Sequence, residues 1–195
     1  MSPDPHQHRQ QKGQPAGGQF AAKGNPESDD LAEFSGEVSS TPRGLNSSHN
    51  PDGSLRGHVA STAVVEDTAT VGPNASVRED AHVLEQAAVI DNAVVGGDAV
   101  IAGRSVISES AVVDDHAVVD EDARVDGHAA VIGNSYVTDE AHVTGEALIH
   151  AWGKVADRAV VTSQTVVTGA AMVAGSAVVS GNTFVVGRAV VGKQE

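Results

Sequence analysis

A strict six-residue period dominates the sequence between Gly57 and Gln194. The 138 residues of this stretch divide into 23 repeats without one insertion or deletion. The third place of each repeat is Val in 20 cases and Ile in three, and the first place is Ala in 17. A fixed internal period is typical of repeat architectures, in which each unit buries its apolar face only by stacking on its neighbours. The period therefore predicts a solenoid.

Each repeat is predicted to be a short strand followed by a corner. Side chains two residues apart in an extended chain point to the same face, so places one and three face inward together. Place five is Gly in nine repeats and Asp or Glu in nine others, and place six is mostly polar, as at Asn74 and Asn92. These residue types tolerate the backbone dihedrals that a sharp bend requires. We therefore expect coils of strands and corners that stack on one another.

This pattern resembles the hexapeptide-repeat family, in which Val or Ile recurs every six residues after a small residue, as in Ala63-Val64-Val65 and Ala69-Thr70-Val71. The resemblance covers about 70 per cent of the chain. It implies an all-β fold, a left-handed parallel β-helix of triangular section, with a right-handed or differently sectioned solenoid as the alternative. Three repeats then make one turn, so that residues 18 apart lie above one another and 23 repeats give seven to eight coils. Within the family, the chain is most similar to its plain, YdcK-like members.

The segment before the repeats has a different composition. Six of the seven prolines lie in residues 1–56, together with many Gln, Gly, Ser and Asn and few large apolar residues. Such a segment buries too little apolar surface to fold alone. We predict that residues 1–56 are a disordered or capping segment and that residues 57–195 form the β-helix domain. Asp30 and Glu33 are spaced as a capping box, which predicts one helical turn that either caps the first coil or docks on a partner.

Composition narrows the location and the partners. The chain has no cysteine, which excludes disulfides and thiolate metal sites and fits a reducing compartment. It contains no apolar run long enough to span a membrane and no secretory signal at its N-terminus. We therefore expect a cytoplasmic protein that does not bind membranes.

Charge is distributed unevenly along the repeats. Residues 57–146 carry three basic side chains against 17 acidic ones, a net charge of −14. Residues 147–195 carry four basic side chains against two acidic ones, a net charge of +2. Nucleic-acid binding requires a basic face that neutralises phosphates, so the acidic repeats argue against it. Stacked carboxylates such as Asp91 and Glu109 are expected to bind a cation weakly at most, and no metal or cofactor is predicted.

The histidines decide whether catalysis is plausible. The repeats contain His58, His82, His116, His128, His142 and His150, and no two of them are 18 apart. Zinc needs three converging imidazoles, and a catalytic histidine needs an orienting carboxylate and a cleft. The resemblance also implies an alternative, because acyltransferases of the family use a histidine as general base. A CoA-type acyl donor would then lie between coils, with His142 or His150 as the base. Its phosphates would contact Lys154, Arg158 or Arg188.

One side of the predicted coil carries an unbroken apolar column. Place two points outward at mid-strand, and on one side its last six members are Val94, Val112, Ala130, Leu148, Val166 and Phe184. A continuous exposed apolar patch marks an interface, and the resemblance implies trimers that pair such sides. We therefore expect a homo-oligomer, with a trimer favoured.

No loop interrupts the repeats to cover an active site. This absence favours a structural or scaffold protein without catalysis, which binds an unknown protein partner or further copies through its flat side and coil ends. We expect the Leu31–Leu55 segment to cover the N-terminal end and the C-terminal end to stay open, which favours head-to-tail or heterologous contacts.

Overall fold

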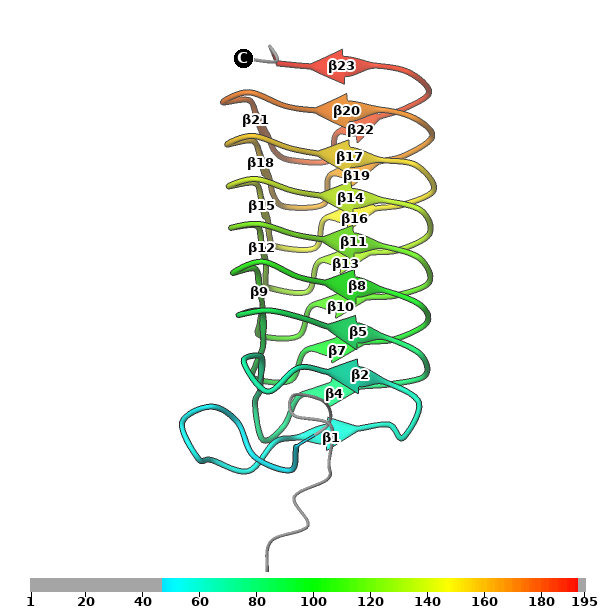
Figure 1. Ribbon diagram of the computed structural model, residues 1–195. Coiled ribbons are helices and arrows are strands. Elements are labelled where there is room, and N and C mark those ends of the chain that lie inside the picture. Colours follow the sequence, from blue (N-terminus) through cyan, green and yellow to red (C-terminus); the bar gives the residue numbers. More distant parts are fainter. Residues whose placement is uncertain (1–46, 193–195) are drawn as a thin grey trace, which may run out of the picture. The chain divides into compact units, whose positions relative to one another are not determined.

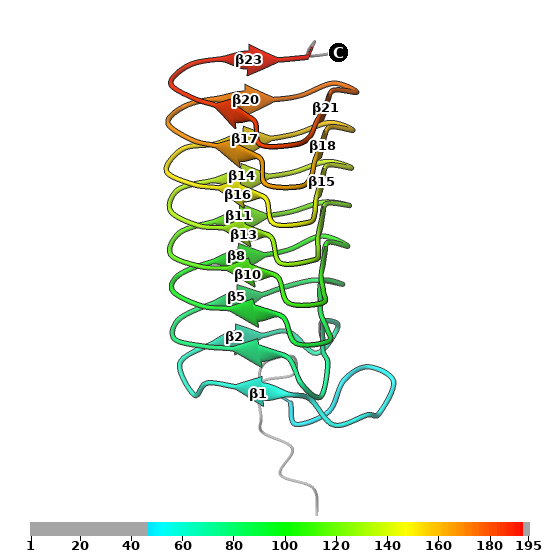
Figure 2. The same ribbon diagram turned by 180° about the vertical axis from the view of Figure 1, so that it is seen from behind.

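The computed structural model describes residues 47–192. Residues 1–46 of the predicted disordered or capping segment 1–56, including the helical turn predicted at Asp30 and Glu33, lie outside the described residues. Residues 47–192 form an all-β parallel solenoid with 23 two-residue strands and without a helix (Figure 1). The strands fall into three sheets, which form the three sides of the coil (Figure 2). The predicted fold class is therefore confirmed. The left-handed sense of the coil stays a prediction.

Every third strand along the chain belongs to the same sheet. The first sheet, here called the β1 side, runs β1 (His58–Val59), β4 (Ser76–Val77), β7 (Val94–Val95), β10 (Val112–Val113), β13 (Ala130–Val131), β16 (Leu148–Ile149), β19 (Val166–Val167) and β22 (Phe184–Val185). The second, the β2 side, runs β2 (Val64–Val65), β5 (His82–Val83), β8 (Val100–Ile101), β11 (Val118–Val119), β14 (Tyr136–Val137), β17 (Lys154–Val155), β20 (Met172–Val173) and β23 (Val190–Val191). The third, the β3 side, runs β3 (Thr70–Val71), β6 (Ala88–Val89), β9 (Val106–Ile107), β12 (Arg124–Val125), β15 (His142–Val143), β18 (Val160–Val161) and β21 (Val178–Val179).

The register confirms three repeats per turn. Val95 pairs with Val113 in the adjacent coil, 18 residues later, and all strand pairs are parallel with this spacing. The 23 strands therefore make seven complete turns and two further strands.

The core is a stack of valines and alanines. Every place-three residue from Val65 to Val173 is 0% exposed. Three place-one residues are polar and equally buried, namely Ser105, Ser135 and Thr165. Each of their hydroxyls donates to the backbone carbonyl three residues earlier, at 2.6 to 2.8 Å. Because each buried polar group has a local partner, the interior accepts it without disturbing the stack.

The corners use the left-handed region of backbone space. All 19 place-five residues from Glu79 to Gly187 have positive φ, between 55° and 79°, and ten of them are not glycine. A side chain in this region costs about 1–2 kcal/mol relative to glycine. The predicted corner at place five is therefore correct, and the acidic residues there must be stabilised by other contacts.

Residues 47–56 cover the N-terminal end of the first coil. His49 and Leu55 form an antiparallel bridge, and the side chain of Asn50 between them is 6% exposed. The Arg56 guanidinium donates to the backbone carbonyls of Glu66 and Ala69, at 2.6 and 3.2 Å. These polar side chains pair with strand and corner groups that have no coil below them.

Candidate functional site

The apolar column predicted on one side exists in the structure. Val94, Val112, Ala130, Leu148, Val166 and Phe184 lie on β7, β10, β13, β16, β19 and β22 and pair in register from coil to coil. We call these six residues the apolar ladder. The first five are half-buried, and Phe184 is 69% exposed. The ladder is therefore a continuous surface strip.

Place four of the same side adds apolar residues to the strip at two coils. Ile132 follows β13, and Val186, which is 52% exposed, follows β22. The corresponding residue after β10 is instead Asp114. His150 and Thr168 follow β16 and β19, so place four is mixed and the continuous apolar strip is the ladder itself.

The other two sides interrupt their outward columns with polar residues. On the β2 side, Tyr136 pairs with Lys154, which pairs with Met172. On the β3 side, Arg124 pairs with His142. The apolar ladder therefore distinguishes the β1 side from both neighbours.

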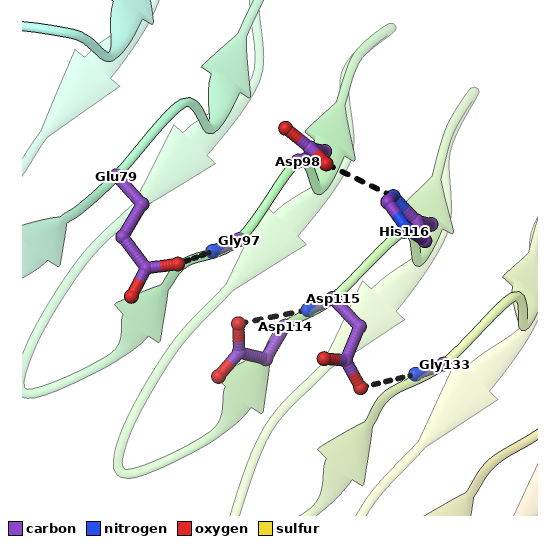
Figure 3. A network of polar contacts seen from close by, with 7 residues as sticks. All are labelled: Glu79, Gly97, Asp98, Asp114, Asp115, His116 and Gly133. Carbon is purple, nitrogen blue, oxygen red and sulfur yellow. Dashed lines mark hydrogen bonds and ion pairs between the residues drawn. The ribbon is translucent and has the colours of Figure 1, made fainter.

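The acidic corner residues form hydrogen bonds within the fold. The carboxylate of Glu79 accepts a hydrogen bond from the backbone N–H of Gly97, one coil above, at 2.9 Å, and Asp115 accepts from Gly133 at 3.0 Å (Figure 3). The same contact, at 2.7 to 3.1 Å, joins Glu85 to Gly103, Asp91 to Glu109, Asp139 to Asp157 and Asp157 to Gly175. Hydrogen bonds from N–H groups to carboxylates are charge-assisted. They therefore help to offset the conformational cost of these corners.

Two coils use a different acceptor where the corner below is glycine. Gly97 and Gly103 have no side chain to offer to the next coil. There the N–H of Asp115 bonds to the neighbouring Asp114 carboxylate at 2.8 Å (Figure 3). In the same way, the N–H of Glu121 bonds to Asp120 at 2.6 Å. Much of the negative charge in the N-terminal half of the solenoid thus has a structural role.

Two stacked carboxylates perturb each other. The repulsion of Asp139 raises the pKa of Glu121, one coil below it. The pKa of Asp139 is instead lowered, because the backbone N–H of Asp157 donates to its carboxylate. Among residues 47–192, no three His, Asp or Glu side chains gather to hold a metal ion.

A histidine–aspartate pair lies on the β3 side. His142 Nε2 is 2.8 Å from Asp126 Oδ2, and their side chains are 35% and 18% exposed. Asp126 follows β12 and His142 begins β15, so the pair joins adjacent coils. A carboxylate on one imidazole nitrogen fixes the ring and leaves Nδ1 as the possible acceptor of a proton.

The other residues of the acyltransferase alternative do not gather around this pair. His150 follows β16 on the β1 side and has Thr168 Oγ1 3.3 Å from its Nδ1. Lys154 lies on the β2 side, and Arg188 lies at the corner between β22 and β23. Arg158 lies at the corner that leads into β18, the strand that pairs with β15 of His142. Within one chain, only Arg158 among the three cations borders the same side as His142.

A surface cavity of about 390 Å³ lies at the N-terminal end of the solenoid, away from the candidate histidines. Its lining residues are Ser47, Ser48, Leu55, Arg56, Gly57, Val59, Ala60 and Ser61. Helices long and apolar enough to cross a membrane do not occur among residues 47–192.

The fold and surface define a class, the parallel β-solenoids built from six-residue repeats with one apolar side. Comparison of the chain with models of protein families gave no match, and comparison with curated proteins gave none either.

Proposed function

We propose that this protein is a scaffold or assembly protein of the hexapeptide-repeat type, which binds partners through its apolar ladder and coil ends without catalysing a reaction. The observation that carries this proposal is the in-register run of six apolar side chains along β7–β22. Strips of this kind are characteristic of interfaces. The resemblance to the family implies trimers that pair such sides. The proposal itself is a homo-oligomer assembled on the β1 side, and a cytoplasmic location is part of it.

The coil ends support binding to different degrees. The N-terminal end is occupied by Asn50 and Arg56, so a head-to-tail contact would have to displace them. In the part of the chain that the structure describes, β21, β22 and β23 are the last strands of their sheets, and their outward residues Val178, Phe184 and Val190 are 61 to 69% exposed. We therefore propose that end contacts use the edge nearest the C-terminus.

Light scattering tests the ladder. The variant Leu148→Lys plus Val166→Lys places two charges at the centre of the strip and should lower the mass of the assembly relative to the parent. The matched control is Val100→Lys plus Val118→Lys, which changes two stacked outward valines on the β2 side and should leave the mass unchanged. An unchanged mass in the ladder variant would remove this side from any interface.

A CoA-dependent acyltransferase is the second candidate, and the His142–Asp126 pair favours it. His142 would accept the proton of the acceptor group while that group attacks the thioester carbonyl, and the CoA thiolate would leave. Thermal-shift measurements with millimolar acetyl-CoA and succinyl-CoA separate the two candidates. Stabilisation that is lost in His142→Ala, but kept in the control His128→Ala, would overturn the scaffold proposal. The scaffold proposal expects no stabilisation by either compound.

A further inference from the structure

We propose that a second copy of this chain packs against the apolar ladder in the antiparallel sense, about a two-fold axis that passes between Ala130 and Leu148. This inference rests on the proposed binding side and adds the partner and its orientation. The two-fold axis lies in the interface and runs parallel to the strands. It therefore reverses the order of the coils in the second copy. The corner that follows the β1 side in one copy still lies beside the corner that follows it in the other copy.

The side chains of the ladder fit this reversal. Ala130 faces Leu148 of the second copy, so the smallest residue of the ladder meets a large one. Val112 faces Val166, and Val94 faces Phe184 at the two ends. A parallel arrangement would instead place Ala130 against Ala130 and Phe184 against Phe184, which leaves a gap at one coil and crowds another. Interfaces pack to the density of protein interiors, so the antiparallel pairing fills the space more evenly.

The charges that flank the ladder are strongly graded along the solenoid. Beside its N-terminal half lie Asp91, Asp98, Glu109, Asp114 and Asp115. Beside its C-terminal half lie one acidic residue, Glu146, and one cation, Arg188. In any parallel assembly, including the trimer that the family resemblance implies, equivalent coils of the copies lie at the same height. The acidic corners of one copy then lie against the acidic corners of another. Juxtaposed like charges suppress association, and the antiparallel sense avoids them.

Two polar pairs follow from the antiparallel register. Arg188 of one copy lies at the same height along the solenoid as Asp98 of the other copy. Both residues occupy place six of the corner that follows the β1 side. Asp98 already has His116 Nδ1 3.1 Å from its carboxylate (Figure 3), so the guanidinium would join an existing pair. Asp114 meets the level of Thr168, whose hydroxyl is able to donate to a carboxylate.

The contact is small. Six coils about 4.8 Å apart and a side of about 15 Å give roughly 450 Å² for each copy, or about 900 Å² in total. This area lies below the standard range for stable complexes. We therefore expect a weak dimer that forms at roughly micromolar concentrations or above and exchanges rapidly.

Crosslinking tests the orientation, and the chain has no native cysteine to interfere. The variants Val94→Cys and Phe184→Cys are treated with a bismaleimide that spans about 10 Å, the usual separation of packed sheets. A mixture of the two variants should give a crosslinked dimer. Each variant alone should not, because its own thiols lie five coils apart, roughly 24 Å along the axis. Crosslinking of either variant alone to the same extent as the mixture, or no crosslinking in the mixture of a dimeric protein, would overturn the antiparallel sense.

Charge reversal provides an independent readout. Arg188→Glu should weaken the dimer roughly tenfold, since two symmetry-related pairs become repulsive. Adding Asp98→Arg should restore it, and the control Lys154→Glu on the β2 side should have no effect. A parent that stays monomeric at several hundred micromolar, roughly a hundredfold above the concentration at which this dimer is expected to form, would overturn both this inference and the proposed homo-oligomer. An oligomer whose single-cysteine variants crosslink to themselves would overturn the orientation alone.

Discussion

The side-chain amide of Asn50 pairs with both backbone groups of Val71. Asn50 Oδ1 accepts from the Val71 N–H at 2.9 Å, and Asn50 Nδ2 donates to the Val71 carbonyl at 3.0 Å. Inside the solenoid, a strand of the coil below supplies these two partners. At the first coil one side chain supplies them, which covers the edge of the sheet that contains β3 and blocks addition of another strand.

Replacing Asn50 should therefore destabilise the solenoid. In Asn50→Ala the Val71 carbonyl keeps the N–H of Gly57, 3.2 Å away, but the Val71 N–H loses its partner. A buried unpaired donor costs about 1–3 kcal/mol, and we expect a loss of this size in urea unfolding. The control is Asn74→Ala at an exposed corner. Equal stability of the two variants would show that the amide pair contributes nothing.

Glycine should be required more strictly at some corners than at others. Gly103 has φ of +66°, and a Cβ there would lie 2.5 Å from the backbone nitrogen of Glu121. Gly181 has φ of +79° but open space around the same position. Gly181→Ala should therefore cost about 1–2 kcal/mol, the conformational cost alone, and Gly103→Ala about 1 kcal/mol more because the next coil must shift. Thermal melts of both variants measure the difference, and equal losses would show that the corners adjust freely.

The Glu121–Asp139 pair predicts an unusual pH dependence. Because the pKa of Glu121 is raised in the folded state, the folded protein binds this proton more tightly than the unfolded chain does. The proton on Glu121 therefore stabilises the folded protein at pH values below the pKa of Glu121 in the unfolded chain. This stabilisation is lost as the pH rises through the pKa of Glu121 in the folded protein. Glu121→Gln should raise the Tm at pH 7, and the gain should disappear near pH 3.

The control for this variant is Glu140→Gln, an exposed glutamate at the same corner of the coil. It should leave the Tm unchanged at both pH values. A Tm of Glu121→Gln that is unchanged or lower at pH 7 would mean that Asp139 does not repel Glu121 in solution.

The sequence was sufficient to predict the solenoid and its apolar side. The six-residue period sets which side chains face inward, and a place-five residue able to adopt positive φ sets each corner. Once three repeats make a turn, the position of every outward residue follows from its number. Val94 and Phe184 are therefore assigned to one side by their residue numbers alone.

The histidine–aspartate pair was missed for a geometric reason. His142 and Asp126 are 16 residues apart, because place two of one coil contacts place four of the coil below. Comparing residues only at a spacing of 18 passes over such diagonal contacts. A comparison at 16 as well as 18 would have found the pair.

The N-terminal cap carries no periodic signal at all. Asn50 and Arg56 precede the first repeat, in a segment whose composition indicates only low apolar content. Their roles depend on reaching Val71 and Glu66, respectively, across the end of the coil. Contacts of this kind are set by three-dimensional proximity and not by local pattern, so the sequence alone could not place them.

The buried hydroxyl of Ser105 should contribute little to the stability of the fold, whereas the small size of this side chain should be required. Its Oγ donates to the Ala102 carbonyl at 2.6 Å, but that carbonyl also accepts the backbone N–H of Ser105 at 3.3 Å. In Ser105→Ala no group loses its last partner, and the stack with Ala87 and Ala123 becomes uniform. We expect a change of less than about 1 kcal/mol.

Ser105→Val is the informative comparison, because it adds bulk where the chain is tightly packed. Ser105 is 0% exposed, so the added methyl groups must displace neighbours in the coils above and below. Overpacking of this kind costs about 1–3 kcal/mol. Urea unfolding of the two variants under the same conditions measures the difference. If Ser105→Val were as stable as Ser105→Ala, limited room between the coils would not be the reason why place one of the repeat holds small residues.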